Sequence, residues 1–326
     1  MVVPTPEPGP GADDAEPLPA DAPGPPWRRW LARVVRWSVG IATVVVLVQI
    51  ARDQADELGS VSFDVSPGWL VPAAVLTVAA DLTLPLGWRH LVAAYGWSIR
   101  RGRAVRAWAL SQATRYLPTG LVAVASRVSL AATEGVPRSV AAASIAIETA
   151  VLLGWSVVIG AAAIPSSVVP LPLRALGGIG ALLALATLPW TVPWAGARLP
   201  RLPDLGALRP KELAESVGVF GLSVALRAGR FVALAAAMLP LAAGDVPLVI
   251  GAAYAGVVAG RVGVTPAGIG VREGVIAAVL ADRFGLGEAA AFAVVVRAWD
   301  FAFELAFLGA ATWWGRRRPV TADPLR

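Results

Sequence analysis

The sequence predicts an all-α, polytopic helical membrane protein, and three observations carry this prediction. Hydrophobic residues make up 56% of the 326 residues and charged residues only 15%, whereas a soluble domain carries about 25% charged residues. Apolar stretches recur that approach or exceed the roughly 20 residues needed to cross a bilayer as a helix. Alternating segments of about 10 residues, the signature of a β-barrel, do not dominate. We expect six full spans and two broken, re-entrant helix hairpins.

The chain divides into one membrane domain between two tails. Residues 1–26 hold nine prolines, three glycines, five acidic residues and no basic residue, a composition typical of disorder. This stretch lacks the basic and apolar regions of a signal peptide. We therefore expect a disordered tail over 1–26, a single transmembrane domain over 27–315 and a basic cytoplasmic tail over 316–326.

Basic residues cluster at alternate ends of the expected spans. Arginines precede the first span, follow the second at 100–106, and follow the last at 316–318. Because cytoplasmic loops carry an excess of arginine and lysine, we expect both termini on the cytoplasmic side of the cell membrane. The six expected full spans are 34–50, 67–88, 139–164, 173–195, 215–239 and 289–314.

The stretch 266–274, Pro-Ala-Gly-Ile-Gly-Val-Arg-Glu-Gly, interrupts an apolar region. Proline lacks a backbone donor, and glycine weakens a helix. Hydrocarbon tolerates such a break only where protein or a water-filled cavity surrounds it. Arg272 and Glu273 place two charges here, where charge is costly, so we expect the functional centre at this break. The residues expected to break the helix are Pro266, Gly268 and Gly270.

A weaker break lies at Pro118 and Gly120, with Arg127 shortly after it. The limb that follows, 121–132, is too short to span, so we interpret 104–133 as a re-entrant hairpin from the cytoplasmic side. Six spans and a cytoplasmic C-terminus require the second hairpin to enter from outside. This arrangement is an inverted repeat, which in transporters places the substrate site at the midplane between broken helices.

Charged residues occur inside the expected spans at helical spacing. Arg297, Asp300 and Glu304 share one helix face, as do Arg227 and Arg230. Each central charge costs on the order of 2.5–3.5 kcal/mol on insertion scales, so we expect these side chains, with Asp81, to converge inside the bundle. The candidate substrate-binding residues are Arg127, Glu148, Arg227, Arg230, Arg272, Glu273, Arg297 and Asp300.

Two interpretations of these charges remain open. Paired guanidinium groups suit a phosphate, but they equally suit buried carboxylates. In the second case the charges, for example Arg297 with Asp300, pair structurally and hold helices together.

Residue types also limit the chemistry. The chain has no cysteine and a single histidine, which argues against a thiolate or multi-histidine metal site. No ATP-binding or catalytic motif occurs. We expect no cofactor, no metal and no nucleic-acid partner, and we expect anionic membrane lipids as partners. The sequence does not predict an oligomeric state.

The stretch 266–274 resembles the signature of the lysylphosphatidylglycerol synthase transmembrane-region family of flippase-like proteins, usually Pro-Gly-Gly-Leu/Ile-Gly-x-Arg-Glu. The stretch 115–120, Arg-Tyr-Leu-Pro-Thr-Gly, with Arg127 beyond it, resembles the family's other motif. The resemblance covers about residues 30 to 315. Ala267 replaces a usual glycine and Thr119 is inserted before Gly120.

The resemblance implies binding or movement of a phospholipid or polyprenyl-phosphate headgroup. We expect aminoacyl transfer to be absent, because only a short segment follows the last span, where some relatives carry a soluble synthase domain. Two other functions remain open. One is a membrane-embedded transferase with a lipid-phosphate donor, using Asp81 or Asp300 as base. The other is a structural or partner-binding membrane subunit.

Overall fold

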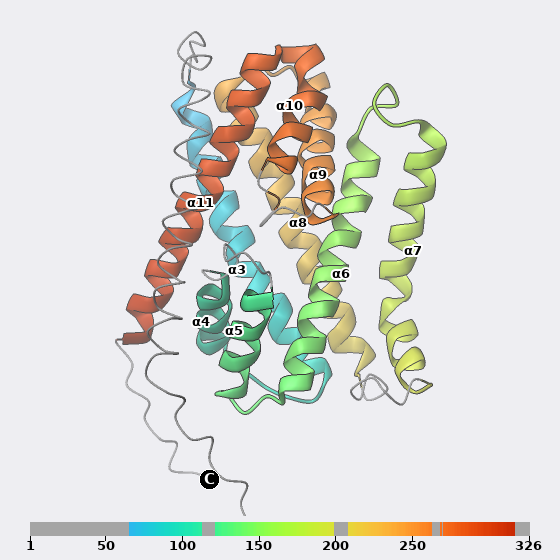
Figure 1. Ribbon diagram of the computed structural model, residues 1–326, viewed down its shortest axis with the longest axis vertical. Coiled ribbons are helices and arrows are strands. Elements are labelled where there is room, and N and C mark those ends of the chain that lie inside the picture. The colour runs from blue at the N-terminus through green and yellow to red at the C-terminus, as the bar shows by residue number, and fades with distance from the viewer. Residues whose placement is uncertain (1–64, 113–120, 199–207, 263–267, 269, 317–326) are drawn as a thin grey trace, which may run out of the picture.

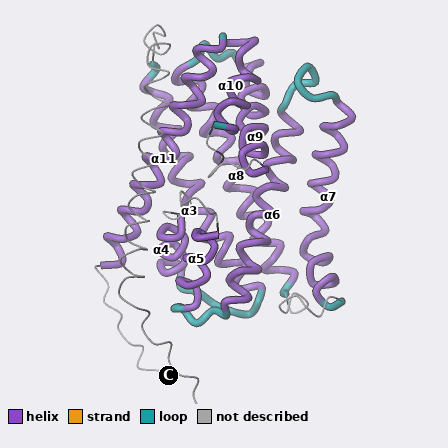
Figure 2. Tube along the Cα trace, in the orientation of Figure 1, coloured by secondary structure: helices purple, strands orange, loops and turns teal. Residues whose placement is uncertain are grey.

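The computed structural model describes residues 65–112, 121–198, 208–262, 268 and 270–316, and every regular element among them is a helix (Figures 1 and 2). This confirms the predicted all-α membrane class. The long helices run roughly along the long axis of the molecule (Figure 1). They are α3 (Leu70–Ala94, after the short η2, Pro67–Trp69), α6 (Arg138–Ala163), α7 (Leu171–Gly196), α8 (Pro210–Met238) and α11 (Leu286–Arg316).

Helices α3 and α8 form the central antiparallel pair. Hydroxyl groups of α8 reach the backbone of α3: Ser216 donates to the Gly87 carbonyl and Ser223 to the Ala80 carbonyl, at 2.9 and 3.1 Å. Such bonds satisfy polar groups where no water is present. The absence of a side chain at Gly87 leaves room for the Phe220 ring, which would lie 2.7 Å from a Cβ atom there. The pair thus forms a close-packed axis.

Two pairs of shorter helices enter from opposite ends of this axis. Helices α4 (Arg101–Gln112) and α5 (Leu121–Ala132) lie in the lower half of Figure 1. Helices α9 (Val246–Val262, after η4, Ala243–Asp245) and α10 (Val271–Phe284) lie in the upper half. We call them the lower and the upper hairpin. Each packs into its own cluster of buried hydrophobic residues, around Trp88 for the lower and Leu280 for the upper. The two hairpins thus lie at opposite ends of the central pair, whereas the sides of the membrane from which they enter stay a prediction.

The upper hairpin breaks at glycines. Gly268 has φ +69° and Gly270 has φ +83°, a backbone region that side chains disfavour. A Cβ atom on Gly268 would lie 2.8 Å from the Cα atom of Gly260 on α9. Glycine therefore permits both the turn and the close approach. Because α10 begins at Val271, the break ends earlier than expected, and Arg272 and Glu273 lie in the first helical turn.

Four predicted spans agree with α3, α6, α7 and α8 within a few residues, and α11 corresponds to the last predicted span. By length and apolar composition, the described residues contain five helices able to cross a membrane: those four and the η4–α9 segment Ala243–Arg261. We assign this segment to the upper hairpin. The expected span 34–50, the tail 1–26, residues 317–326 of the other tail, Pro118, Gly120 and Pro266 lie outside the described residues.

Candidate functional site

The centre of the upper site is one carboxylate shared by two arginines. Arg230 on α8 donates from Nη1 to Oδ1 of Asp300 on α11. Arg272 on α10 lies with Nη1 3.1 Å from Oδ2 of the same side chain. Arg230 is 1% exposed and Asp300 8%. Three helices therefore meet through one buried carboxylate, and one of them begins at the broken hairpin.

Two more ion pairs flank this centre. Arg227 Nη2 donates to Asp81 Oδ1 on α3 at 2.6 Å. Arg297 Nε lies 3.8 Å from Glu273 Oε1. Glu273 also accepts a hydrogen bond from the Gly270 backbone N–H at 2.7 Å, which satisfies a free donor at the start of α10. Glu273 thus fixes the end of the break as well as facing an arginine.

Aromatic rings support the arginines. The Phe231 ring centroid lies 4.5 Å from the Arg230 guanidinium carbon and 5.6 Å from that of Arg272, within the range of cation–π attraction. Tyr254 on α9 packs edge-on to Phe231 and donates its hydroxyl to the Val224 carbonyl. Among the described residues, the Nε–H of Arg230 has no hydrogen-bond partner.

The charges of this site are unequal in number. We call the seven charged side chains the arginine-rich cluster. Its four arginines and three carboxylates leave one positive charge in excess within the set. Such a set can accept an anion, provided that an arginine exchanges its carboxylate partner for it. The members are Asp81, Arg227, Arg230, Arg272, Glu273, Arg297 and Asp300.

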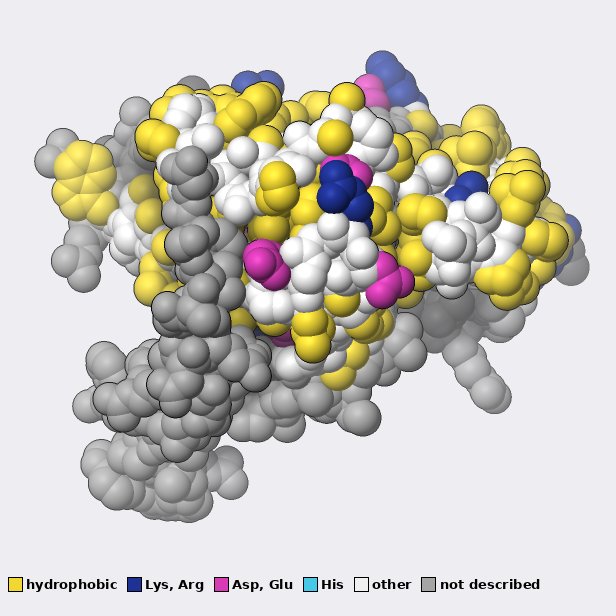
Figure 3. Space-filling model, turned by 90° about the horizontal axis from the view of Figure 1, so that it is seen from above, with side chains coloured by type: hydrophobic (Ala, Val, Ile, Leu, Met, Phe, Trp, Pro, Cys, Tyr) yellow, Lys and Arg dark blue, Asp and Glu magenta, His cyan; other side chains and the backbone are white. Residues whose placement is uncertain are grey.

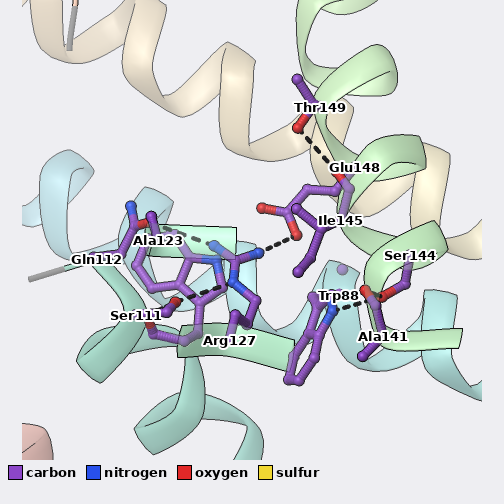
Figure 4. Close-up of polar contacts among 12 residues, drawn as sticks. Trp88, Ser111, Gln112, Ala123, Arg127, Ala141, Ser144, Ile145, Glu148 and Thr149 are labelled. Atoms are coloured by element: carbon purple, nitrogen blue, oxygen red, sulfur yellow. Dashed lines mark hydrogen bonds and ion pairs between the residues drawn. The ribbon is translucent and has the colours of Figure 1, made fainter. Parts of the chain in front are cut away.

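The lower hairpin holds a different kind of site (Figure 4). Arg127 on α5 donates from Nη1 to Glu148 Oε2 on α6 at 2.6 Å and from Nε to Ser111 Oγ at 3.0 Å. Its Nη2 lies 3.4 Å from Gln112 Oε1. Arg127 and Glu148 are 6% and 5% exposed. As far as the structure describes this region, the site is a one-to-one pair with polar partners on all three guanidinium nitrogens.

Two tryptophans flank the lower arginine. The ring centroids of Trp88 and Trp108 lie 5.9 and 5.7 Å from the Arg127 guanidinium carbon. The Trp88 indole N–H donates to Ser144 Oγ at 3.0 Å, as Figure 4 shows. The Trp108 indole N–H is buried and has no hydrogen-bond partner within the described part of the chain. The two rings therefore lie at similar distances from Arg127 but differ in the hydrogen bonding of their indole N–H groups.

The structure groups the eight predicted site residues into two sets. Arg127 and Glu148 form the lower pair, and the other six belong to the arginine-rich cluster. The structural alternative named Arg297 with Asp300, but each pairs with other helices. Five residues of these two sites were not among the predicted candidates: Asp81, Trp88, Trp108, Phe231 and Tyr254. Only Asp81 had a signal, a charge inside an apolar span; the aromatic residues had none that separates them from ordinary packing.

No curated protein sequence matches this chain. A family model described as "Lysylphosphatidylglycerol synthase TM region" matches residues 35–307. This range includes both hairpins, the arginine-rich cluster and the lower pair. Since the match covers most of the sequence, the chain is an integral membrane protein that belongs to the lysylphosphatidylglycerol synthase transmembrane-region family.

Proposed function

We propose that this protein binds the anionic headgroup of a phospholipid or polyprenyl phosphate and moves it across the cell membrane. The observation that carries the proposal is the sharing of Asp300 by Arg230 and Arg272. Two guanidinium groups from different helices converge there on one pair of oxygens. A phosphate presents oxygen pairs of similar spacing, to which arginine binds through its planar fork.

The start of α10 adds to the positive potential at this place. Backbone N–H groups at a helix N-terminus favour anions, and Arg272 lies in the first turn of α10. Because α10 follows a break, a small change in the break can move Arg272 relative to Arg230 on the continuous helix α8. We assign headgroup binding to the arginine-rich cluster, and we assign to the lower pair the role of holding α5 against α6.

We propose transport rather than catalysis. A lipid-phosphate transferase would need a carboxylate as base, and the two expected candidates were Asp81 and Asp300. In the structure Asp81 accepts a hydrogen bond from Arg227, and Asp300 is shared by two arginines. Both carboxylates are thus engaged as partners of arginine, which favours a role in binding over a role as catalytic base.

We further propose that the lower end of the molecule in Figure 1 faces the cytoplasm. Basic residues outnumber acidic ones there, with Arg101 beginning α4 and Arg138 beginning α6, and such an excess marks the cytoplasmic side. The native chain has no cysteine, so a thiol reagent labels only a cysteine that is introduced by substitution. Ser139→Cys and Ser167→Cys are matched exposed sites at the two ends of α6. A membrane-impermeant maleimide should label Ser167→Cys in intact cells and Ser139→Cys only after permeabilisation; the reverse pattern contradicts this orientation.

The transport proposal is tested with purified protein in phosphatidylcholine vesicles. Fluorescent phosphatidylglycerol and fluorescent polyprenyl phosphate are compared with fluorescent phosphatidylcholine, and dithionite quenching counts the label in the outer leaflet. We expect faster transfer of an anionic label than of phosphatidylcholine. Arg272→Ala should slow this transfer at least about tenfold, the effect of about 1.4 kcal/mol.

Arg209→Ala is the matched control, because Arg209 lies 64% exposed beside Glu212 at the start of α8. It should transfer lipid at the wild-type rate. Arg272→Lys keeps the charge but loses the fork, so its rate should lie between those of the wild type and Arg272→Ala. Equal rates for Arg272→Ala and the wild type would refute the proposal.

A further inference from the structure

Asp300 occupies the place that a bound phosphate would need. Its two carboxylate oxygens accept separately from Arg230 and Arg272, and these arginines come from different helices. An incoming phosphate can bind both guanidinium groups only if the carboxylate withdraws from them. Headgroup and carboxylate therefore compete for the same donors.

Once the headgroup has displaced it from the two arginines, the Asp300 carboxylate is a buried charge without its cationic partners. Asp300 is 8% exposed, and it lies near the middle of α11, away from either end of the helix. A buried carboxylate that loses its cationic partners is poorly solvated, and such a group becomes neutral by taking up a proton. The negative charge that the headgroup brings is thereby balanced by the one that Asp300 loses.

We propose that a proton is the co-substrate of this protein: Asp300 takes up one proton when an anionic headgroup replaces its carboxylate at Arg230 and Arg272, and returns it when the headgroup leaves. The inference rests on the proposed function. For a singly charged phosphodiester, lipid and proton then move in the same direction without net charge.

The neighbouring charges favour Asp300 over the other carboxylates of the cluster. On α10, Glu273 keeps its bond to the Gly270 N–H and faces Arg297, which comes from α11. On α3, Asp81 keeps Arg227 of α8. Helix α4 packs against α11 through Trp108 and Phe307, and Glu304 follows Asp300 by one turn on α11 itself. Among the ion pairs of the described cluster residues, Asp300 is the carboxylate that pairs with both Arg230 and Arg272, the arginines that the headgroup would bind.

The experiment imposes a pH gradient on the phosphatidylcholine vesicles with fluorescent phosphatidylglycerol and measures the final label in each leaflet. With one proton per lipid, a gradient of one pH unit drives the leaflet ratio toward about tenfold, because one pH unit equals a tenfold proton ratio. A membrane potential alone should leave the ratio unchanged. An ionophore that dissipates the gradient should restore an even distribution.

Asp300→Asn keeps the shape but cannot take up the proton, so its label should stay evenly distributed in the gradient. Asp245→Asn, at the surface pair with Arg283, is the control and should respond as the wild type does. Proton entry into wild-type vesicles, read by a trapped pH dye as lipid is transferred, tests the coupling without any variant.

The outcomes separate the two proposals. Wild-type transfer of lipid with an even final distribution and no proton entry overturns the proton inference and leaves the proposed function standing. A gradient response that persists in Asp300→Asn overturns the assignment to Asp300. Absence of lipid transfer in the wild type overturns the proposed function itself.

Discussion

The two hairpins both hold a buried arginine against a carboxylate, but they pair these charges differently. Each brings one arginine from a short helix to a carboxylate on the long helix that follows it: Arg127 to Glu148, and Arg272 to Asp300. Counted over the described residues, the lower arginine has one carboxylate partner and neutral polar groups on its other nitrogens. The upper carboxylate serves two arginines. A one-to-one pair with polar partners is suited to holding helices, whereas an excess of arginine is suited to exchanging one anion for another.

The largest expected effect comes from breaking the lower pair. Removing one partner of a buried ion pair leaves an uncompensated charge, which typically costs about 3–5 kcal/mol. Arg127→Met and Glu148→Leu should each lower the free energy of unfolding in detergent by about that amount, measured by thermal or denaturant unfolding.

The double variant Arg127→Met with Glu148→Leu sharpens this result. Apolar replacements of similar size often restore the stability lost with a buried pair, so we expect the double variant to be more stable than either single variant. If the losses of unfolding free energy in the two single variants simply added in the double variant, the two side chains would act independently. The interpretation that this pair holds the helices together would then be wrong.

The next largest effect is expected in the upper hairpin, and it falls more on transport than on stability. Arg272→Ala leaves Asp300 paired with Arg230, so no carboxylate of that centre is orphaned. The loss should be about 1.5–3 kcal/mol, the range for a hydrogen bond to a charged group, below that of Arg127→Met. The same unfolding measurement applies. If Arg272→Ala destabilised more than Arg127→Met, the contrast between the hairpins would fail.

The sequence was sufficient for the helical membrane class, and it marked the charged residues that the structure brings together, because each left a local mark. A proline with glycines marks a helix break, and charges inside apolar spans mark a buried polar site. The pairing of those charges, by contrast, left no local mark in the sequence. Asp81 and Arg227 are 146 residues apart, and helical spacing suggested the local pair Arg297 with Asp300. Packing of α8 and α10 against α11 instead supplies Asp300 with two arginines from other helices, which no spacing along one helix encodes.

The aromatic walls of the lower site allow a smaller and more selective comparison. Trp88→Phe and Trp108→Phe remove indole rings at similar distances from Arg127, but only Trp88 donates to Ser144. We expect Trp88→Phe to cost about 1 kcal/mol more than Trp108→Phe, the net value of one hydrogen bond. Thermal unfolding of the two variants in parallel measures the difference. Equal losses would show that the rings contribute through packing alone.

The smallest effect is expected at the exposed pair that ties η4 to the end of α10. Figure 3 views the molecule from above, where basic and acidic side chains lie among hydrophobic ones. Arg283 donates to both oxygens of Asp245, at 2.7 and 2.9 Å. These hydrogen bonds, with one from the Ala242 N–H, hold the pKa of Asp245 below its ordinary 3.8. A carboxylate with a lowered pKa stabilises the fold above its unfolded pKa and loses this contribution as pH falls through the folded value.

Asp245→Asn should therefore lower Tm slightly at neutral pH, on the order of 1 °C, since exposed pairs contribute little. The difference from the wild type should shrink as the pH is lowered below 3.8, and also in high salt, which screens exposed charges. Thermal unfolding across pH, with Arg283→Gln as the matched variant, measures it. A difference that persisted at low pH would show that Asp245 acts through something other than its charge. A fall as large as that of Glu148→Leu would mean that burial does not separate the pairs of this protein.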